Sequence, residues 1–195
     1  QYIELLDRIL ANGVRREDRT GTGTLSVFGH QMRFDLREGF PLLTTKKMFT
    51  RGMIAELLWI ISGDTNEHTL RDQNVNFWRE WADPVTGDLG PIYGKQLREQ
   101  NSIVFVDDAI DPEVSIVDQL EETVTRLKED PFSRRHVITL WNAPEVPYMR
   151  LTPCHGIVIQ FYVTPDANGE PFTLSCQMYQ RSGDAFLGVP INIAS

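Results

Sequence analysis

The chain has 195 residues, of which 41% are hydrophobic and 24% are charged, and its formal net charge is −8. These values are typical of one globular domain with a sizeable core, and the negative charge argues against a protein that binds duplex nucleic acid through a basic face. The two cysteines lack a Cys-x-x-Cys spacing, the four histidines are dispersed and no long apolar run is present. We therefore expect no metal site, no membrane span and a cytoplasmic location.

The first part of the chain is predicted to hold a helix, a loop and a strand. Apolar residues at helical spacing predict a short amphipathic helix over residues 1–10. The small-residue loop 18–24 follows and leads into a predicted strand over residues 25–34. Arg19 in that loop, with free backbone N–H groups and hydroxyls around it, could hold a phosphate. The alternative is an ordinary turn.

A second helix is predicted over residues 50–62, with an apolar stripe that faces inward. That stripe consists of Met53, Ile54, Leu57, Leu58 and Ile61. Glu56 interrupts this apolar setting, and burial would raise its pKa; a place on the exposed flank of the helix is the alternative. Trp78 and Trp81 are spaced to share a helix face, as core residues or as a platform for an aromatic ligand. A glycine-punctuated loop then carries Tyr93.

The middle of the chain is predicted to contain an acidic, irregular surface insert over residues 101–113. Ser115 and Asp118 resemble a capping box and predict a helix that starts there and ends at Asp130-Pro131. Arg134 and Arg135 come next, immediately before a predicted strand. Paired arginines are either solvated surface or a site for a phosphate dianion.

The last third of the chain is predicted to form a β-hairpin. Residues 156–163 and 172–178 have strand composition and flank a polar loop that contains an Asn-Gly pair. Folding the hairpin about the middle of this loop sets Cys154 opposite Arg181. A thiol that faces a guanidinium is favoured as the thiolate, which is the nucleophilic form. The alternative is a buried structural cysteine beside an unrelated surface arginine.

The chain resembles the thymidylate synthase family almost from end to end. The resemblance rests on these motifs: Asp18-Arg19-Thr20-Gly21-Thr22-Gly23-Thr24, Glu56-Leu57-Leu58-Trp59, Gly63-Asp64-Thr65-Asn66, Trp78 with Trp81-Ala82-Asp83, Gly90-Pro91-Ile92-Tyr93-Gly94, Ser133-Arg134-Arg135, Pro153-Cys154-His155, Tyr179-Gln180-Arg181-Ser182, and Asp184 with Phe186-Leu187-Gly188 and Pro190-Ile191-Asn192-Ile193-Ala194-Ser195. It implies one α+β catalytic domain over residues 1–195, with a large twisted sheet packed back to back in a homodimer and helices on the other face. Because relatives continue beyond the position of Ser195, it also implies that the C-terminal part of the family fold is missing.

The activity implied by the resemblance is the reductive methylation of dUMP to dTMP. 5,10-Methylenetetrahydrofolate serves as co-substrate, no metal takes part, and the enzyme is a transferase of nucleotide biosynthesis. Cys154 would attack C6 of the uracil as a covalent catalyst. The catalytic set carried over from the family is Cys154, Glu56, Tyr93, Arg181 and Asp184.

The resemblance also implies two sets of binding residues. For dUMP these are Arg19, Arg134, Arg135, Gln180, Arg181, Ser182, Gly183, Asp184 and Asn192. For folate they are Phe49, Trp78, Trp81, Asp184, Leu187 and Gly188. Arg134 and Arg135 would reach the phosphate from the partner subunit, and the amide of Asn192 would read the uracil edge.

The sequence departs from the family pattern in several places. Cys154 and Gln160 lie six positions apart, where relatives have five, and Gly156 is the natural place for a bulge that absorbs the extra residue. Unusual side chains stand at three further positions, namely Phe49, Phe77 and Leu97.

Two other functions compete with the synthase reading. One is a pyrimidine hydroxymethylase on the same scaffold, which adds water instead of hydride. Asn192 argues against its cytosine version, and Trp78 argues against water addition in general. The other is a catalytically inactive homologue that binds a nucleotide or RNA, which the set Cys154, Arg181, Asp184 and Asn192 argues against.

Overall fold

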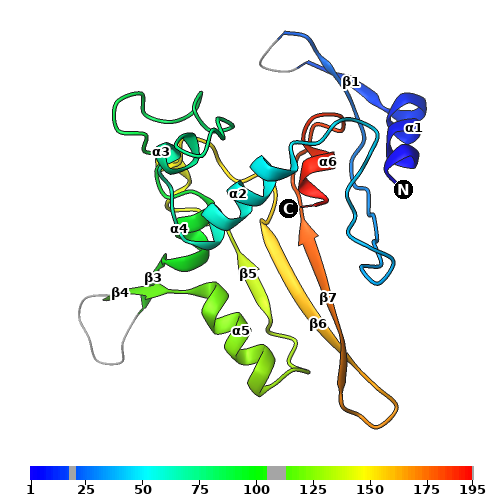
Figure 1. The fold of residues 1–195 in the computed structure, drawn as a ribbon, viewed down its shortest axis with the longest axis vertical. Coiled ribbons are helices and arrows are strands. Elements are labelled where there is room, and N and C mark those ends of the chain that lie inside the picture. Colours follow the sequence, from blue (N-terminus) through cyan, green and yellow to red (C-terminus); the bar gives the residue numbers. More distant parts are fainter. Residues whose placement is uncertain (18–20, 105–112, 195) are drawn as a thin grey trace. The chain divides into compact units, whose positions relative to one another are not determined.

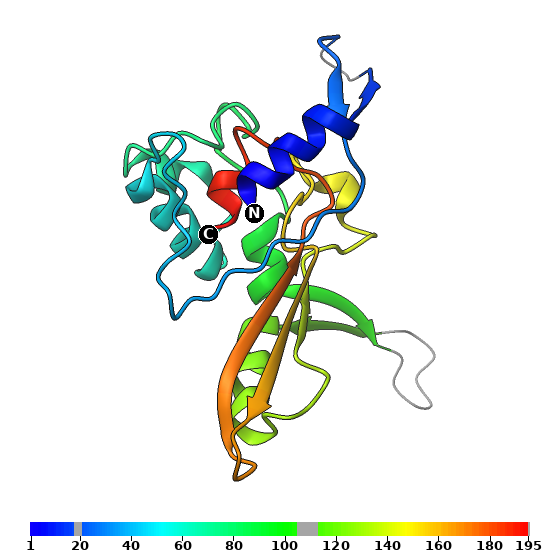
Figure 2. The same ribbon diagram turned by 90° about the vertical axis from the view of Figure 1, so that its right-hand side faces the viewer.

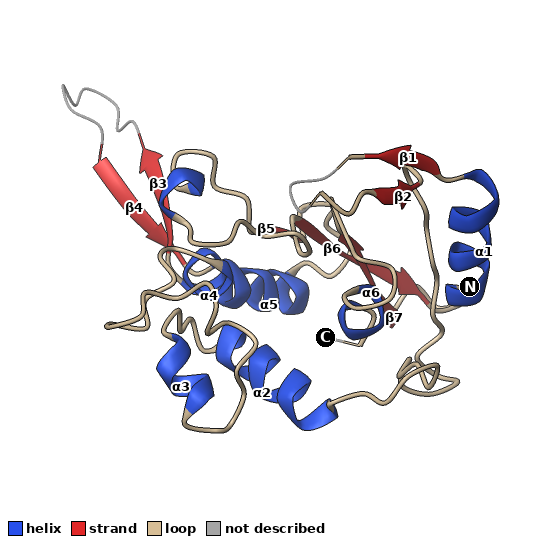
Figure 3. Ribbon diagram, turned by 90° about the horizontal axis from the view of Figure 1, so that it is seen from above, coloured by secondary structure: helices blue, strands red, loops and turns tan. Residues whose placement is uncertain are grey.

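The computed structural model describes residues 1–17, 21–104 and 113–194, so the predicted phosphate ligand Arg19 lies outside the described residues. Helices and antiparallel sheets together give the α+β class (Figure 3). The residues form two compact units, Gln1–Met48 with Asp184–Ser195, and Phe49–Gly183. The single catalytic domain remains a prediction, and each unit is described by itself below.

The first unit is built around its N-terminal helix. Its elements are α1 (Tyr2–Asn12), β1 (Val14–Arg16), β2 (Thr24–Ser26) and α6 (Val189–Asn192) (Figure 1). Tyr2 and Leu5 of α1 are buried against Val189 of α6. The predicted first helix is thus present and extends two residues further, to Asn12.

The strand predicted over residues 25–34 is much shorter in the structure, where β2 ends at Ser26. The cause is the lack of a partner. Ser26 pairs with Val14, the first residue of β1, and the chain before Val14 is helical. Among the described residues, the pairing between β1 and β2 therefore stops at Ser26.

The second unit carries most of the secondary structure. Its helices are α2 (Thr50–Ile61), α3 (Glu67–Arg71), α4 (Tyr93–Arg98) and α5 (Gln119–Glu129), with a 3₁₀ turn at Val146–Tyr148. Its strands are β3 (Gln100–Val104), β4 (Glu113–Val117), β5 (Val137–Thr139), β6 (Val158–Pro165) and β7 (Pro171–Tyr179). They form the antiparallel pair β3-β4 and the antiparallel sheet β5-β6-β7, with α5 packed along β5 (Figures 1 and 2). Among the described residues no sheet exceeds three strands, so the large sheet expected from the resemblance is not formed within them.

Helix α2 confirms the predicted helix but not its predicted inward face. Met53 and Trp59 are buried, whereas Ile54, Leu58 and Ile61 are 53%, 59% and 38% exposed. The sequence of α2 is apolar on several sides, so spacing alone does not select the side that packs. The core takes Trp59, the largest side chain of the helix, which packs with Trp78, Leu70 and other buried residues.

Two expectations for the middle of the chain were wrong. The described ends of the predicted irregular insert belong to β3 and β4. The following helix begins after Asp118 and not at Ser115, because Asp118 Oδ1 accepts the backbone N–H of Glu121 at 2.9 Å and caps the helix. The β-branched residues Ile116 and Val117, predicted inside the helix, extend β4 instead.

The hairpin of β6 and β7 confirms the prediction for the last third of the chain. Its turn is fixed by Asp166, whose Oδ1 accepts the N–H groups of Asn168 and Glu170 at 2.8 and 2.9 Å. Gly169 supplies the left-handed backbone of this turn, with φ of 89°. The long ribbon is plainest in Figure 2.

Within the described residues, no helix is long and apolar enough to cross a membrane. No three His, Cys, Asp or Glu side chains in the same residues gather as a metal site would require.

Candidate active site

Cys154 lies in the segment that leads into β6, and its thiol is half-buried beside helix α4. The backbone N–H of Cys154 donates to Tyr93 Oη at 2.9 Å. The same hydroxyl donates to Cys154 Sγ at 3.7 Å. Tyr93 therefore holds both the backbone and the sulfur of Cys154, although 61 positions separate the two residues.

The surroundings of Tyr93 keep its hydroxyl protonated. Burial raises the pKa of Tyr93 well above its usual range, and negative charge on Cys154 raises it further. The hydroxyl therefore keeps a proton that it can donate to the sulfur. A hydrogen bond to a thiolate favours the charged, nucleophilic form.

His155 completes the immediate contacts of the thiol. Its Nδ1 lies 3.4 Å from Cys154 Sγ and 3.3 Å from Tyr93 Oη, and its ring stacks at a tilt on the Tyr93 ring with centroids 4.9 Å apart. Burial lowers the pKa of His155 to about 4, so the ring is neutral at neutral pH. Sequence reasoning did not assign His155 a role. Its one signal was adjacency to Cys154.

Glu56 and Trp78 lie one layer behind Tyr93. Glu56 Oε1 accepts the indole N–H of Trp78 at 2.6 Å. Burial raises the pKa of Glu56, and the hydrogen bond from Trp78 opposes that rise only in part. Trp78 packs between Trp59 and Tyr93, with ring centroids 5.9 and 5.7 Å away. The contacts thus run without a break from Glu56 to Cys154.

Arg181 is close to Cys154, but its guanidinium does not point at the sulfur. The backbone N–H of Arg181 donates to Cys154 O at 2.9 Å. Its Nε donates to Pro153 O at 2.8 Å, and its Nη2 donates to Thr152 Oγ1 at 3.0 Å. Arg181 therefore fixes the two residues before Cys154. The hairpin pattern had instead predicted a guanidinium that faces the thiol.

Gly156, where the sequence predicted a bulge, lies outside the strand that follows Cys154. The β6–β7 ladder starts at Val158, so Gly156 lies before the strand. Its φ is 65°, and a Cβ there would meet Leu140 Cδ1 at 2.8 Å. The left-handed backbone favours glycine at this position, and a larger residue would also have to displace the Leu140 side chain.

The other predicted binding residues of the second unit are spread along its surface. Arg134 and Arg135 are exposed in the loop before β5. Phe49 and Phe77 are 47% and 40% exposed and meet edge to face, with ring centroids 5.9 Å apart. Four further predicted residues follow the same pattern of partial or full exposure: Trp81, Gln180, Ser182 and Gly183.

The remaining predicted residues belong to the first unit. The carboxylate of Asp184 accepts the N–H groups of Phe186 and Leu187 at 2.8 and 2.6 Å, which shapes the turn before α6. Lys46 Nζ donates to the carbonyls of the same two residues at 2.8 and 3.2 Å. This turn includes Gly188, and Asn192 lies on α6. Asp184 thus serves a local structural role besides the catalytic role that the resemblance implies.

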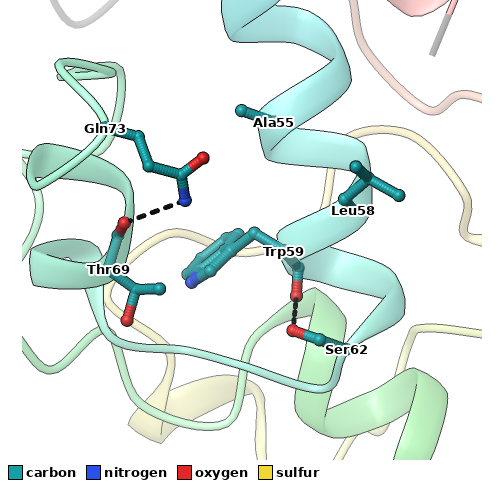
Figure 4. A pocket seen from close by; sticks show the side chains of 6 residues that line it. All are labelled: Ala55, Leu58, Trp59, Ser62, Thr69 and Gln73. Atoms are coloured by element: carbon teal, nitrogen blue, oxygen red, sulfur yellow. Dashed lines mark hydrogen bonds between the residues drawn. The ribbon is translucent and has the colours of Figure 1, made fainter.

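A cavity of about 270 Å³ opens between α2 and α3, away from the contacts of Cys154 (Figure 4). Six side chains line it: Ala55, Leu58, Trp59, Ser62, Thr69 and Gln73. Two of its polar groups are satisfied locally, because Ser62 Oγ donates to Trp59 O and Gln73 Nε2 donates to Thr69 O, at 2.8 and 3.1 Å. None of the predicted catalytic residues lines this cavity.

The comparison with known families agrees with the motifs. A family model described as thymidylate synthase matches residues 1–195, the whole chain.

Proposed function

The chain belongs to the thymidylate synthase family, and from this premise we propose that it converts dUMP to dTMP through a covalent bond between Cys154 Sγ and C6 of the uracil. Membership implies a folate-dependent enzyme of nucleotide biosynthesis. The observation that carries the proposal to particular residues is the pair of contacts at the thiol, 3.7 Å to Tyr93 Oη and 3.4 Å to His155 Nδ1.

The proposed first step uses groups that already touch one another. The Cys154 thiolate adds to C6, and the electron pair of the C5–C6 double bond moves toward O4, which leaves C5 nucleophilic. The donated hydrogen bond from Tyr93 stabilises the thiolate before attack. His155 is neutral and adds no positive charge at the sulfur, so the proposed stabilisation comes from Tyr93. Glu56, whose pKa is raised by burial, is suited to hold a proton and exchange it with the base.

We propose that the phosphate of dUMP is held by arginines, namely Arg19, Arg134, Arg135 and Arg181. The exposure of Arg134 and Arg135 supports a role toward a second copy of the chain. The homodimer, with these two arginines shared across its interface, and the cytoplasmic location remain proposals. Ser182, Gln180 and Asn192 are the proposed hydrogen-bonding partners of the nucleotide.

Folate is proposed to bind near the aromatic residues at the start of α2. The exposed edge-to-face pair of Phe49 and Phe77 offers an apolar surface that fits an aromatic ring. Methylenetetrahydrofolate, when bound, supplies the one-carbon unit and the hydride. The residues of this chain position it and exclude water, and Trp78 and Trp81 are the proposed wall.

The nearest alternative is a hydroxymethylase on the same scaffold. The two reactions share the attack by Cys154 and differ in whether hydride or water completes the product. Trp78 favours the synthase, because a buried and fixed indole is suited to exclude water. Trp78 is only 6% exposed, and Glu56 holds its indole N–H.

Mass analysis of the nucleotide product, with a parallel absorbance assay for dihydrofolate, tests this proposal. We expect dTMP and dihydrofolate in equal amounts. 5-Hydroxymethyl-dUMP without dihydrofolate would establish the alternative reaction.

A matched pair of variants tests the nucleophile, and with it the inactive-homologue reading. Cys154→Ser is expected to lose nearly all activity and to form no covalent adduct with fluorodeoxyuridylate and folate, because a hydroxyl is a far weaker nucleophile than a thiolate. Cys176→Ser, at the second cysteine, is expected to form the adduct normally. Adduct formation by the Cys154 variant would refute the assignment.

A further inference from the structure

Glu145 is a carboxylate bound by three amides. Its Oε2 accepts from Gln96 Nε2 at 2.5 Å and from Asn142 Nδ2 at 3.2 Å, and its Oε1 accepts from Asn101 Nδ2 at 2.6 Å. Among the described residues Glu145 forms no ion pair with a lysine, arginine or histidine. Neutral amides add little long-range attraction, so the three bonds mainly fix where the carboxylate lies.

Gln96 is the most firmly held of the three donors. Its side chain is fully buried, and its Nε2 also donates to Pro91 O at 2.8 Å. Its backbone carbonyl accepts from Gln119 Nε2 at 2.7 Å. Any shift of Gln96 would leave buried polar groups without partners, which is costly. Glu145 is therefore tied to a rigid point of α4.

Gln96 and Glu145 lie on the two segments that meet at the thiol. Gln96 lies three positions after Tyr93 on α4. Glu145 begins the segment of residues 145–154, which ends at Cys154. The contact between Gln96 and Glu145 thus joins the same two segments that the contact between Tyr93 and Cys154 joins at the thiol.

A backbone contact lies between these two points. The N–H of Arg150 donates to Leu89 O at 3.0 Å. Gly90, with φ of 73°, lets the backbone of Tyr148 approach so closely that a Cβ would lie 2.2 Å from its carbonyl oxygen. Glycine permits this contact, which involves residues before α4 and not α4 itself. The directional bonds of Glu145 tie the segment of Cys154 to α4.

We propose that Glu145 is a positioning residue for the nucleophile, which acts through Gln96 to hold Cys154 Sγ within reach of the Tyr93 hydroxyl. The proposal rests on the proposed role of Cys154. It assigns Glu145 no contact with either substrate. Its effect is to keep the sulfur beside its hydrogen-bond donor.

The test measures thiol reactivity directly. In the Cys176→Ser background, Cys154 is the only cysteine of the chain, so the rate of alkylation by iodoacetamide at neutral pH reports on it alone. Glu145→Gln keeps the shape of the side chain but sets an amide against the amide donors. We expect alkylation and kcat to fall about tenfold, with KM for dUMP little changed, since small misplacements at a reacting atom cost on the order of ten- to a hundredfold.

The controls separate positioning from general damage. Glu170→Gln neutralises an exposed carboxylate at the hairpin turn and is expected to leave both rates unchanged. Asn101→Ala removes one donor of the three and is expected to give a smaller fall in the same direction, which serves if Glu145→Gln does not fold.

The direction of the change decides the outcome. A loosened site would expose the thiol and speed its alkylation, whereas loss of the Tyr93 donor slows it. An unchanged or faster rate in a variant that keeps its fold by circular dichroism would overturn the proposal. Alkylation does not depend on turnover, so failure of the proposed function would show separately, as absence of dTMP from the unmodified enzyme.

Discussion

Tyr93→Phe, which removes one oxygen atom from the site, should lower the free energy of unfolding and slow the reaction of the Cys154 thiol. The ring packing against Trp78 and His155 would remain, because the centroid contacts at 5.7 and 4.9 Å involve only the ring. What is lost is the acceptor for the N–H of Cys154 and the donor to its sulfur. An unpaired, partly buried N–H costs roughly 1–3 kcal/mol, and a hydrogen bond to a charged group contributes roughly 1.5–3 kcal/mol.

The second figure corresponds to a roughly ten- to a hundredfold slower reaction of the sulfur. Urea unfolding measures the first effect, and iodoacetamide alkylation in the Cys176→Ser background measures the second. Tyr148→Phe is the control, because the Tyr148 side chain is 74% exposed and no hydrogen bond of its hydroxyl is seen in the described part of the chain. If Tyr93→Phe and Tyr148→Phe gave equal unfolding free energies and alkylation rates, the Tyr93 hydroxyl would have no such role.

Three further changes test other parts of the structure. Burial raises the folded-state pKa of Glu56. The stability that Glu56 contributes is therefore full below its unfolded pKa of about 4.3 and is lost as the pH rises through the folded pKa. Glu56→Gln should become more stable relative to the unaltered protein as the pH rises, and a constant difference in urea unfolding across pH would contradict this. Gly156→Ala should lower the unfolding free energy by about 1–3 kcal/mol from backbone strain alone. The loss should exceed that of Gly169→Ala, because of the two positions only Gly156 would place the new Cβ against a neighbour, Leu140. Equal losses would argue against that contact. Asn192→Asp should lower turnover of dUMP and raise relative acceptance of dCMP, because a carboxylate cannot donate to uracil O4, and unchanged selectivity would remove Asn192 from base recognition.

The sequence predicted best those features that depend on neighbouring residues. The β6–β7 hairpin followed from alternation and turn residues, and α1 and α2 followed from helical spacing. It predicted poorly what depends on partners far along the chain. The ladder of β2 stops at Ser26 because its partner strand is short, and the packed side of α2 is chosen by the core around Trp59.

The candidate site shows the same division. Cys154, Tyr93 and Glu56 were found from motifs, which carry no geometry. His155 was missed, because adjacency to a cysteine does not reveal that a ring will be buried against a tyrosine 62 positions away. The direction of the Arg181 guanidinium was also missed, since strand register places a backbone but does not choose among the rotamers of a long side chain.

The spacing of the contacts along the chain has a consequence for how the site assembles. The turn at Asp166 fixes the β6–β7 hairpin locally, and hairpins form within about 1–10 μs. Pairing at the base of this hairpin brings Arg181 to Cys154. The hydroxyl of Tyr93 can arrive only after a much longer loop has closed, which is slower. During folding, the sulfur is therefore expected to pass through a stage in which its neighbours from the hairpin are in place but its donor from α4 is absent, and in that interval it is most open to oxidation.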